Sequence, residues 1–275
     1  MKKFDIPVVV DLPGVGTNLQ DHYEISVQGS VKNDFSALDG CTFEGDAADP
    51  CIKRYNTPIL GNRGIYASPG LGATMFYQSS VAEKNNWDIF AFGGPVNFRG
   101  YFPNYSVNAT AVHNLFSWAI LKAHPRNTAG TVSLQSADPL DVPAITYNYF
   151  DTGVGEYEKD VTAMAEAIAL TRNAFASQLV PVTEVLPGAD VDTPEEIADY
   201  IKDSAWGHHA SSTCPIGADD DKMAVLDSNF NVRGTKGLRV VDASVFPRIP
   251  GTFTAVSTYM VAEKAADVIL AAAEA

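Results

Sequence analysis

The sequence is poor in basic residues and histidine, and it contains no long apolar run. Its 19 Lys and Arg face 33 Asp and Glu, a formal net charge of −14. This balance argues against nucleic acid or an anionic membrane surface as a partner. No stretch approaches the roughly 20 apolar residues that cross a bilayer, so no membrane-spanning segment is expected. The opening MKKFDIPVVVDLPG does not resemble a signal peptide, because its apolar run is short and lacks a small-residue cleavage site.

Several motifs of common enzyme sites are also missing. There is no G-x-S-x-G, which disfavours a hydrolase with its serine on a strand-to-helix turn. Neither G-x-G-x-x-G after a strand nor G-x-x-x-x-G-K-[ST] occurs. The chain alone therefore lacks the usual loop that binds the phosphates of a dinucleotide.

The three cysteines are too few for a disulfide framework. Cys41 and Cys51 could close a small loop, but two reduced thiols fit the sequence about equally well. N-x-S/T sequons at Asn104 and Asn108 are compatible with secretion, although such triplets often arise by chance. The localisation therefore stays open.

Short strands come first along the chain and helices later, which indicates an α+β fold rather than regular βαβ alternation. Alternating apolar runs predict strands near residues 24–31, 73–78, 87–94, 114–123, 129–136 and 143–150. Continuous apolar runs predict buried strands at Ile6–Val10 and 237–244. Helices are expected at 156–176, at 194–205 after an Asp192 or Thr193 N-cap, and from near Thr254 to the end. Met260, Val261, Ala265 and Val268 are expected on one side of the last helix.

The segment WGHHASSTCPIG, residues 206–217, concentrates the candidate chemistry. His208, His209 and Cys214 could ligate a metal, but adjacent histidines seldom share one ion, so no metal site is predicted. Ser211 or Ser212 could be a nucleophile with a histidine base, but the absence of a G-x-S-x-G motif disfavours this interpretation. The third interpretation is a lone histidine base in a redox site, which requires a cofactor.

The segment from 237 to the C-terminus bears on that cofactor. A carboxylate at Asp242 could accept hydrogen bonds from ribose or ribityl hydroxyls, and Ala243 would let a backbone N–H approach a phosphate. A helix from near Thr254 would direct its positive end at a flavin ring that becomes anionic on reduction. On physical grounds alone, a core strand followed by a turn is an equally good interpretation.

The same segments resemble the glucose–methanol–choline (GMC) family of FAD-dependent oxidoreductases, in its choline-dehydrogenase-like branch. HHASSTCPIG is similar to the family's H-x-x-G-T-C-x-M-G, and ADDDKMAVLDSNFNVRGTKGLRVVDASVFPRIP follows in the family's order. VVVDLPGVGTNLQDH at 8–22 resembles the motif that leads from the flavin domain to the substrate domain. NRGIYASPG and HPRNTAGTVSLQSADPLDVPAITYNYF match further landmarks, so the resemblance spans nearly the whole chain.

The resemblance implies the C-terminal half of such a protein. Residues 1–22 would end the first FAD-domain segment, 23–204 would form a substrate-binding domain, and 205–275 would be the returning FAD-domain segment. The fold would be α+β, with a mainly antiparallel sheet and flanking helices, beside an incomplete FAD-binding domain without its G-x-G-x-x-G Rossmann unit. A small-molecule alcohol and a complementary N-terminal FAD-domain half are the expected partners.

The resemblance also assigns roles to residues. His209 corresponds to the base that takes the alcohol proton while a hydride passes to flavin N5, with His208 as its neighbour. Asp242 and Ala243 correspond to contacts of the FAD ribityl and pyrophosphate. Gly251, Thr252, Phe253 and Thr254 correspond to the loop under the isoalloxazine edge.

Two positions depart from the family pattern. The glycine before Thr-Cys is Ser212 here, a small change that we expect to be tolerated. The second catalytic position, usually His or Asn, falls on Phe253, which can neither accept a proton nor hydrogen-bond an alkoxide. His208 and Arg248 are the candidate replacements.

Three functions therefore stay open: an FAD-dependent alcohol oxidase or dehydrogenase, a non-redox lyase or cyclase that keeps the flavin, and a fragment or subunit that is inactive alone. The sequence does not identify the substrate or the electron acceptor. Aromatic residues of the β-rich region could line an apolar cavity, although such residues more often belong to a core; they are Phe92, Phe98, Phe102 and Trp118.

Overall fold

The computed structural model describes residues 1–68, 70–83, 86–150 and 156–274. The chain forms two compact units. Unit 1 comprises Met1–His22, Ala123–Asp160 and Gly207–Ala275, and unit 2 comprises Tyr23–Lys122 and Val161–Trp206. Residues 123–160 thus pack with the two terminal segments, whereas the predicted substrate domain ran through them from 23 to 204. The functional names of these segments stay predictions.

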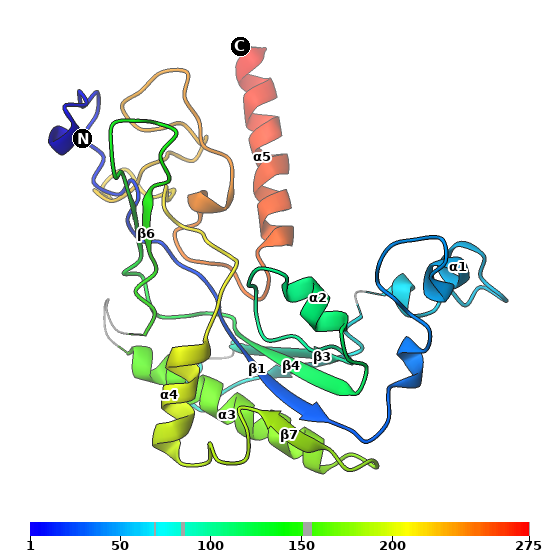
Figure 1. The fold of residues 1–275 in the computed structure, drawn as a ribbon. Coiled ribbons are helices and arrows are strands. Elements are labelled where there is room, and N and C mark those ends of the chain that lie inside the picture. Colours follow the sequence, from blue (N-terminus) through cyan, green and yellow to red (C-terminus); the bar gives the residue numbers. More distant parts are fainter. Residues whose placement is uncertain (69, 84–85, 151–155, 275) are drawn as a thin grey trace. The chain divides into compact units, whose positions relative to one another are not determined.

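Unit 2 is built on a five-stranded antiparallel sheet (Figure 1). Its strand order is β2-β3-β4-β1-β7, and every pair of neighbours is antiparallel. The sheet confirms the mainly antiparallel α+β fold and four predicted strands, and it adds the short β7. The strands are β1 (Tyr23–Ser30), β2 (Ala73–Tyr77), β3 (Ile89–Gly94), β4 (Leu115–Lys122) and β7 (Thr183–Leu186).

Strand β1 shows how polar residues are buried in this sheet. Ile25 and Val27 alternate with Ser26 and Gln28, and all four are buried. The Ser26 hydroxyl donates to the Phe98 carbonyl at 2.6 Å, and Gln28 Nε2 donates to Ser117 Oγ at 2.8 Å. These bonds offset the desolvation of the polar side chains, so β1 is buried on both faces.

Two long helices lie with this sheet, as the sequence predicts. Helix α3 (Tyr157–Ala176) buries Met164 and Ile168 fully, and its Phe175 ring packs on Phe116 of β4. Helix α4 (Pro194–Ser204) begins at a capping box. Thr193 Oγ1 accepts from the Glu196 N–H, and the Glu196 carboxylate accepts from the Thr193 N–H. Thr193, not Asp192, is therefore the N-cap.

The remaining part of unit 2 consists of loops and short helices. These are η2 (Ser36–Leu38), α1 (Pro50–Asn56), η3 (Ile65–Ala67) and α2 (Tyr105–Thr110). Cys41 and Cys51 are joined by a disulfide, with Cα atoms 5.2 Å apart, so the bridged alternative is the one that forms. Both sequon residues, Asn104 and Asn108, are exposed.

Unit 1 contains less regular structure. A short hairpin pairs β5 (Thr131–Ser133) with β6 (Ala144–Thr146), inside the two predicted strands. The 3-10 helices η1 (Lys2–Phe4) and η4 (Ala243–Val245) and the helix α5 (Ala255–Ala273) complete it. Its core packs α5 against the segment 225–245, through Val225, Leu226, Phe230, Val232, Val245 and Ala265.

Two predicted buried strands are wrong. Val8 and Val9 are 46% and 89% exposed, and Ile6–Val10 forms no strand. In 237–244 only Arg239 makes a bridge, to Asn231, and Val241 is 36% exposed. A strand needs a row of backbone partners. Among the described residues, neither segment has a neighbouring strand that supplies one.

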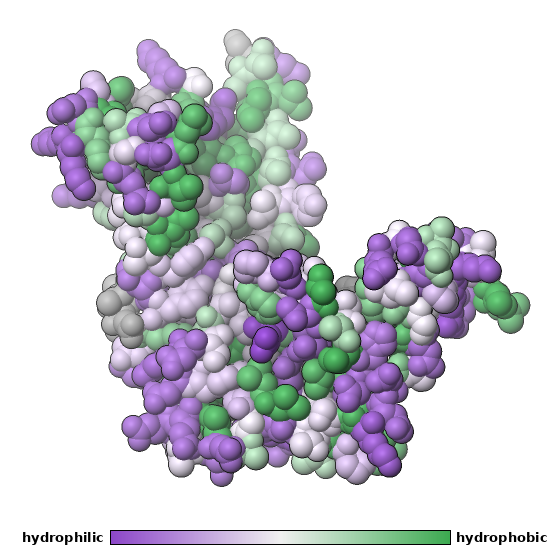
Figure 2. Space-filling view, viewed as in Figure 1, coloured by the Kyte–Doolittle hydropathy of each residue, from purple (hydrophilic) through white to green (hydrophobic). Residues whose placement is uncertain are grey.

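Helix α5 keeps a large apolar surface exposed. Ala265 is buried and Val261 packs on the core, whereas Met260, expected on the same side of the helix, is 68% exposed. Figure 2 shows apolar surface along this helix, and Val256, Tyr259 and Leu270 are among its exposed large side chains. In the described part of the chain, no helix is long and apolar enough to cross a membrane.

We predict that unit 2 depends on a buried ion pair. Lys122 Nζ lies 3.3 Å from Asp88 Oδ2, and both side chains are nearly inaccessible. Asp88→Asn should lower the free energy of unfolding by about 3 kcal/mol in urea denaturation, because the Lys122 charge loses its buried counter-charge. Adding Lys122→Met should recover part of this loss. Asp219→Asn, in the exposed pair with Arg233, should change nothing measurable. Equal effects of the two Asp→Asn variants would contradict the prediction.

Candidate active site

Three segments of unit 1, far apart in sequence, run side by side and hold the histidine segment. Gln20 and Ser211 exchange backbone hydrogen bonds at 3.1 and 2.9 Å. The N–H groups of Ser212, Cys214 and Ile216 donate to the carbonyls of 243–245. The Gln20 side chain accepts from the Ile249 N–H at 3.1 Å. The backbone of 209–216 is therefore fixed on both sides.

The Asp21 carboxylate connects this framework to the histidines. Its Oδ1 accepts from the backbone N–H of His22 at 2.9 Å and of His209 at 2.7 Å. Its Oδ2 accepts from the Tyr149 hydroxyl at 2.6 Å. Asp21 is only 4% exposed. Burial raises the pKa of its carboxyl above the usual value, and the hydrogen bonds to the ionised form oppose that shift.

Gly207 is needed where it stands. A Cβ there would lie 2.1 Å from Asp21 Oδ2 and 2.3 Å from the Tyr149 hydroxyl oxygen. Any larger residue would push the carboxylate away from the His209 N–H. The hydrogen bonds that Asp21 accepts from His209 and Tyr149 therefore require glycine at position 207.

The two histidines held by Asp21 contact each other directly. His22 Nδ1 and His209 Nδ1 are 2.9 Å apart, and the rings meet edge to face. His22 Nε2 lies 3.0 Å from the Ala123 carbonyl oxygen, which can only accept, so Nε2 carries a proton. The Nδ1 of a neutral His22 is then an acceptor. His209 must donate from Nδ1, so its Nε2 is the unprotonated ring nitrogen.

Both imidazoles are held neutral. Burial and the neighbouring His209 lower the pKa of His22 to about 3. Burial and His208 lower the pKa of His209 to about 4. His208 is more exposed, but partial burial of its ring also lowers its pKa. At neutral pH the site therefore presents an uncharged imidazole with a basic Nε2.

Phe253 lies beside His209, where the sequence comparison placed it. Its ring centroid is 5.6 Å from that of His209, at 71°. His208, one candidate replacement, has its ring centroid 3.9 Å from His209. Arg248, the other, is exposed in the turn before Ile249. The side chain of His209 hydrogen-bonds that of His22, which was not among the candidates.

Ser212 adopts a left-handed backbone conformation, with φ 75°, and is fully buried. This explains why the family pattern has glycine there, since a Cβ in this conformation costs roughly 1–2 kcal/mol. The Ser212 hydroxyl lies 3.1 Å from that of Ser211, and this hydrogen bond offsets part of that cost.

Cys214 does not join the histidines. Its thiol is hydrogen-bonded to Ser244, and burial raises the pKa of the thiol. Among the described residues, no set of ligand atoms combines Cys214 with His208 and His209. The three-ligand arrangement considered from the sequence does not form.

The segment from Asp242 to the start of α5 has hydrogen-bonding groups that suit a flavin nucleotide. Asp242 is exposed, and the Ser244 N–H and hydroxyl both bind its Oδ1, which leaves Oδ2 for a ligand hydroxyl. Ala243 begins η4 directly after it. Thr254 stands at the N-cap of α5 without a side-chain cap, so the first N–H groups of this helix are available to a partly negative ring edge.

The loop before α5 passes close to another histidine. A Cβ on Gly251 would lie 2.6 Å from His124 Cε1, so only glycine fits there. Thr252 is half-buried and Phe253 is 38% exposed. The resemblance assigned Gly251 to Thr254 to one loop, and the structure keeps them together between His124, His209 and α5.

Sequence reasoning missed the residues that hold the base. Asp21, His22, Tyr149 and His124 were not singled out, although Asp21-His22 closes the motif VVVDLPGVGTNLQDH. That motif was interpreted only as a domain transition. A histidine and an aspartate at its end were the available signal, but nothing local shows that they contact a segment 187 residues away.

Comparisons with known proteins show which family the chain belongs to. The sequence model of the GMC oxidoreductase family matches residues 125–262. Oxygen-dependent choline dehydrogenases from Vibrio vulnificus and Cronobacter sakazakii are 34% and 33% identical to the chain, over 98% and 97% of its length. The match covers 46% and 45% of those proteins, so the chain spans about half the length of the curated relatives it matches.

Solved structures show the same fold. A structure of Aspergillus oryzae formate oxidase, from work on its FAD modification, superposes with a TM-score of 0.81 at 24% identity. It covers 98% of this chain and 49% of its own. A fungal aryl-alcohol oxidase superposes with a TM-score of 0.68 at 22% identity, over 100% of this chain and 51% of its own.

We predict that Asp21 stabilises unit 1 through its three accepted hydrogen bonds. Asp21→Ala leaves three donors without this acceptor and should cost about 3 kcal/mol or more. Asp21→Asn should cost about 1 kcal/mol or less, because its oxygen can still accept the two N–H bonds and its amide can donate to the Tyr149 oxygen. Urea unfolding measures both, and hydrogen exchange of 16–22 and 207–216 localises the effect. Equal losses for both variants would argue against the carboxylate arrangement.

We predict that His22 makes the fold acid-sensitive. Its pKa is about 3 in the folded state and 6.5 in the unfolded state, so between these values the unfolded chain binds more protons. Its contribution is complete above pH 6.5 and is lost as the pH falls towards 3. His22→Gln keeps a donor for the Ala123 carbonyl and an acceptor for His209. It should reduce the pH slope of the unfolding free energy between pH 6 and 4 by about 1.4 kcal/mol per pH unit. An unchanged slope would contradict this.

Proposed function

Because this chain belongs to the GMC oxidoreductase family, we propose that it is the part of an FAD-dependent oxidoreductase that activates the CH–OH group of an alcohol. His209 is the general base in this proposal. The single observation that supports it best is the hydrogen-bond chain from the Ala123 carbonyl through His22 to His209. That chain leaves His209 Nε2 unprotonated and facing away from His22.

A base for alcohol oxidation must take the hydroxyl proton as the carbon loses its hydride. His209 Nε2 can take this proton because the imidazole is neutral at working pH, since burial and His208 lower its pKa to about 4. When the imidazole becomes charged, its Nδ1–H points at the bare Nδ1 of His22, which strengthens that hydrogen bond. When FAD is bound, its isoalloxazine ring supplies the acceptor for the hydride.

The His22–His209 hydrogen bond means that the base is oriented without a polar side chain at position 253. A second polar group at that position is expected to bind the alcohol oxygen. Here the Phe253 ring meets the His209 ring edge to face. The orientation of the base is supplied from the other side, by His22 and Asp21.

The residues that would contact FAD follow from the fit described above. Asp242 Oδ2 would accept from ribityl hydroxyls, and the N–H groups around Ala243 would approach the pyrophosphate. Gly251 to Thr254 and the start of α5 would lie under the ring, with the positive helix end stabilising negative charge. The G-x-G-x-x-G strand–helix unit, which this sequence lacks, has to come from a complementary FAD-domain segment.

We predict that alcohol oxidation requires His209 as its general base. In the protein completed by a segment with the G-x-G-x-x-G unit and loaded with FAD, alcohol should bleach the flavin absorbance anaerobically. His209→Ala should slow bleaching by about 10²-fold or more, while leaving FAD content unchanged. The wild-type bleaching rate should decrease on acidification only as the pH approaches about 4.

Asp219→Asn, an exposed change in the same unit, is the matched control and should leave the rate as it was. Unchanged bleaching in His209→Ala would remove the assigned role. Turnover of the alcohol without any flavin bleaching would favour a non-redox lyase or cyclase. A chain that binds FAD stoichiometrically by itself would show that the complementary segment is not required.

A further inference from the structure

We propose that unit 2 carries a binding site for a neutral small molecule with one aromatic ring, and that the Cys41–Cys51 disulfide holds one wall of this site. The site is a cavity of about 330 Å³ between the sheet, α2 and the disulfide-closed loop. It goes beyond the alcohol chemistry proposed for unit 1, because neither the cavity nor its walls include a residue of that unit.

The walls are aromatic and aliphatic side chains from three separate segments. Phe92 comes from β3, Phe98 from the loop after it, and Tyr105 from α2. Phe43 comes from the disulfide loop. Of the four aromatic residues singled out from the sequence, Phe92 and Phe98 line this cavity. Trp118 lines another cavity of unit 2. The Cζ atom of Arg99 lies 5.5 Å from the centroid of the Phe102 ring.

The ring geometry suits a guest ring. Tyr101 and Tyr105 meet edge to face at 5.0 Å, and Phe98 meets Tyr101 in the same way at 5.3 Å. Such pairs present ring faces and edges to a neighbour, and a guest ring at 4.5–7 Å continues the pattern. Tyr101 and Tyr105 are 47% and 37% exposed, and the Tyr105 hydroxyl can donate to one polar atom of the ligand.

Charge decides between a neutral and a cationic guest. Among the described residues that line the cavity, none is Asp, Glu, Lys or Arg. A cation would leave water without a carboxylate counter-ion in the wall, so only the ring faces could attract it. The aliphatic side of Leu38, Ile65 and Val112 offers no such attraction, which favours a neutral guest. The volume is at the lower end of the range for ligand sites, which fits one ring with a short substituent.

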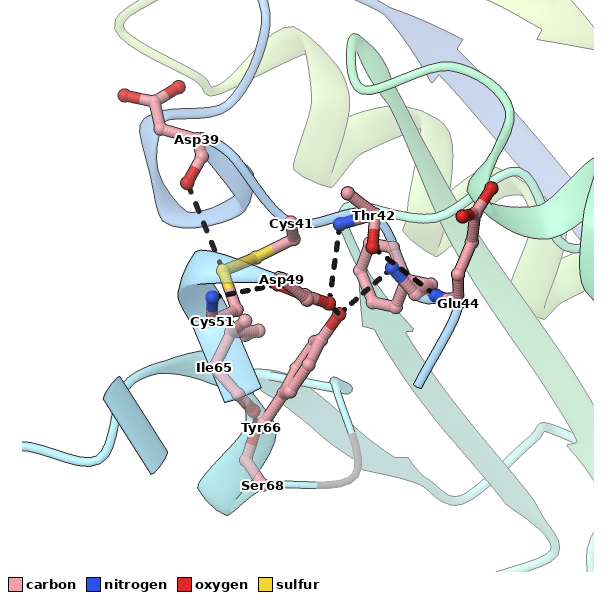
Figure 3. Close-up of a disulfide and its surroundings, with 10 residues drawn as sticks. Asp39, Cys41, Thr42, Glu44, Asp49, Cys51, Ile65, Tyr66 and Ser68 are labelled. Atoms are coloured by element: carbon pink, nitrogen blue, oxygen red, sulfur yellow. Dashed lines mark hydrogen bonds between the residues drawn. A yellow bond between two sulfur atoms is a disulfide. The ribbon is translucent and has the colours of Figure 1, made fainter. Parts of the chain in front are cut away.

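The disulfide fixes the Phe43 wall (Figure 3). It closes the loop that begins two residues before Phe43 and ends at α1. Inside the loop, Asp49 is fully buried and accepts from the Tyr66 hydroxyl at 2.5 Å and from the Cys51 N–H at 2.7 Å. The Tyr66 oxygen in turn accepts from the Phe43 N–H at 3.0 Å, and the two rings pack at 5.3 Å. Opening the disulfide releases this arrangement, so the wall is no longer pre-organised for the ligand.

Acetophenone is a suitable probe for the intact chain. It has one ring and a carbonyl that can accept from a tyrosine hydroxyl, and it has no CH–OH group to react in the site of unit 1. Calorimetric titration should show saturable binding with one site. Tetramethylammonium, which is cationic, non-aromatic and without a CH–OH group, should bind at least about tenfold more weakly. Tetramethylammonium binding as tight as that of acetophenone would overturn the neutral class.

Matched variants locate the binding. Phe43→Ala should weaken acetophenone binding at least about fivefold, whereas Phe76→Ala, an exposed β2 residue outside the cavity, should change it less than about twofold. Val112→Trp fills the cavity and should abolish binding, and Val107→Trp on the outer face of α2 should not. Circular dichroism confirms the fold of each variant. Binding that is unaffected by both Phe43→Ala and Val112→Trp would overturn the assigned site.

The disulfide is tested by the double variant Cys41→Ser/Cys51→Ser and by reduction of the wild type. Both should weaken acetophenone binding at least about threefold with an unchanged sheet signal. Equal affinity in the oxidised, reduced and serine forms would show that the disulfide does not hold the wall. None of these results depends on flavin binding or on His209, so failure here and failure of the alcohol-oxidation proposal are separable.

Discussion

The candidate active site depends on the hydrogen bonds that the buried Asp21 carboxylate accepts. It accepts hydrogen bonds from the main chain of His22 and of His209, which are 187 residues apart, and from the Tyr149 hydroxyl. Because both imidazoles are positioned from one carboxylate, their contact is set by backbone geometry rather than by flexible side chains. Gly207 is required beside it, and the backbone bonds of 211–216 to 243–245 extend the same fixed geometry to the cofactor segment.

This arrangement assigns the protons without reference to any ligand. A carbonyl that can only accept fixes the tautomer of His22, and His22 then fixes that of His209. Burial keeps both rings neutral. The base is thus oriented by the fold, without a contribution from Phe253.

Local sequence patterns predicted the local structure well and the distant contacts poorly. The helices α3, α4 and α5 and the strands β1 to β4 of unit 2 follow from periodicity and capping residues such as Thr193, whereas β7 was not predicted. Ile6–Val10 and 237–244 were predicted as strands because apolar runs do not reveal whether a partner strand exists. His209 was found from a motif, whereas its partner His22 was not, because pairing across 187 residues leaves no local signal. The same holds for the disulfide, for which two cysteines in sequence left both redox states open.

The account makes one central claim, that His209 is a neutral base with a bare Nε2 held by His22. Nitrogen-15 NMR of imidazole-labelled protein at pH 7 tests it most directly. The account predicts a protonated Nε2 on His22, a protonated Nδ1 on His209 and an unprotonated Nε2 on His209. A protonated Nε2 on His209, either as the other tautomer or as the imidazolium, would contradict it.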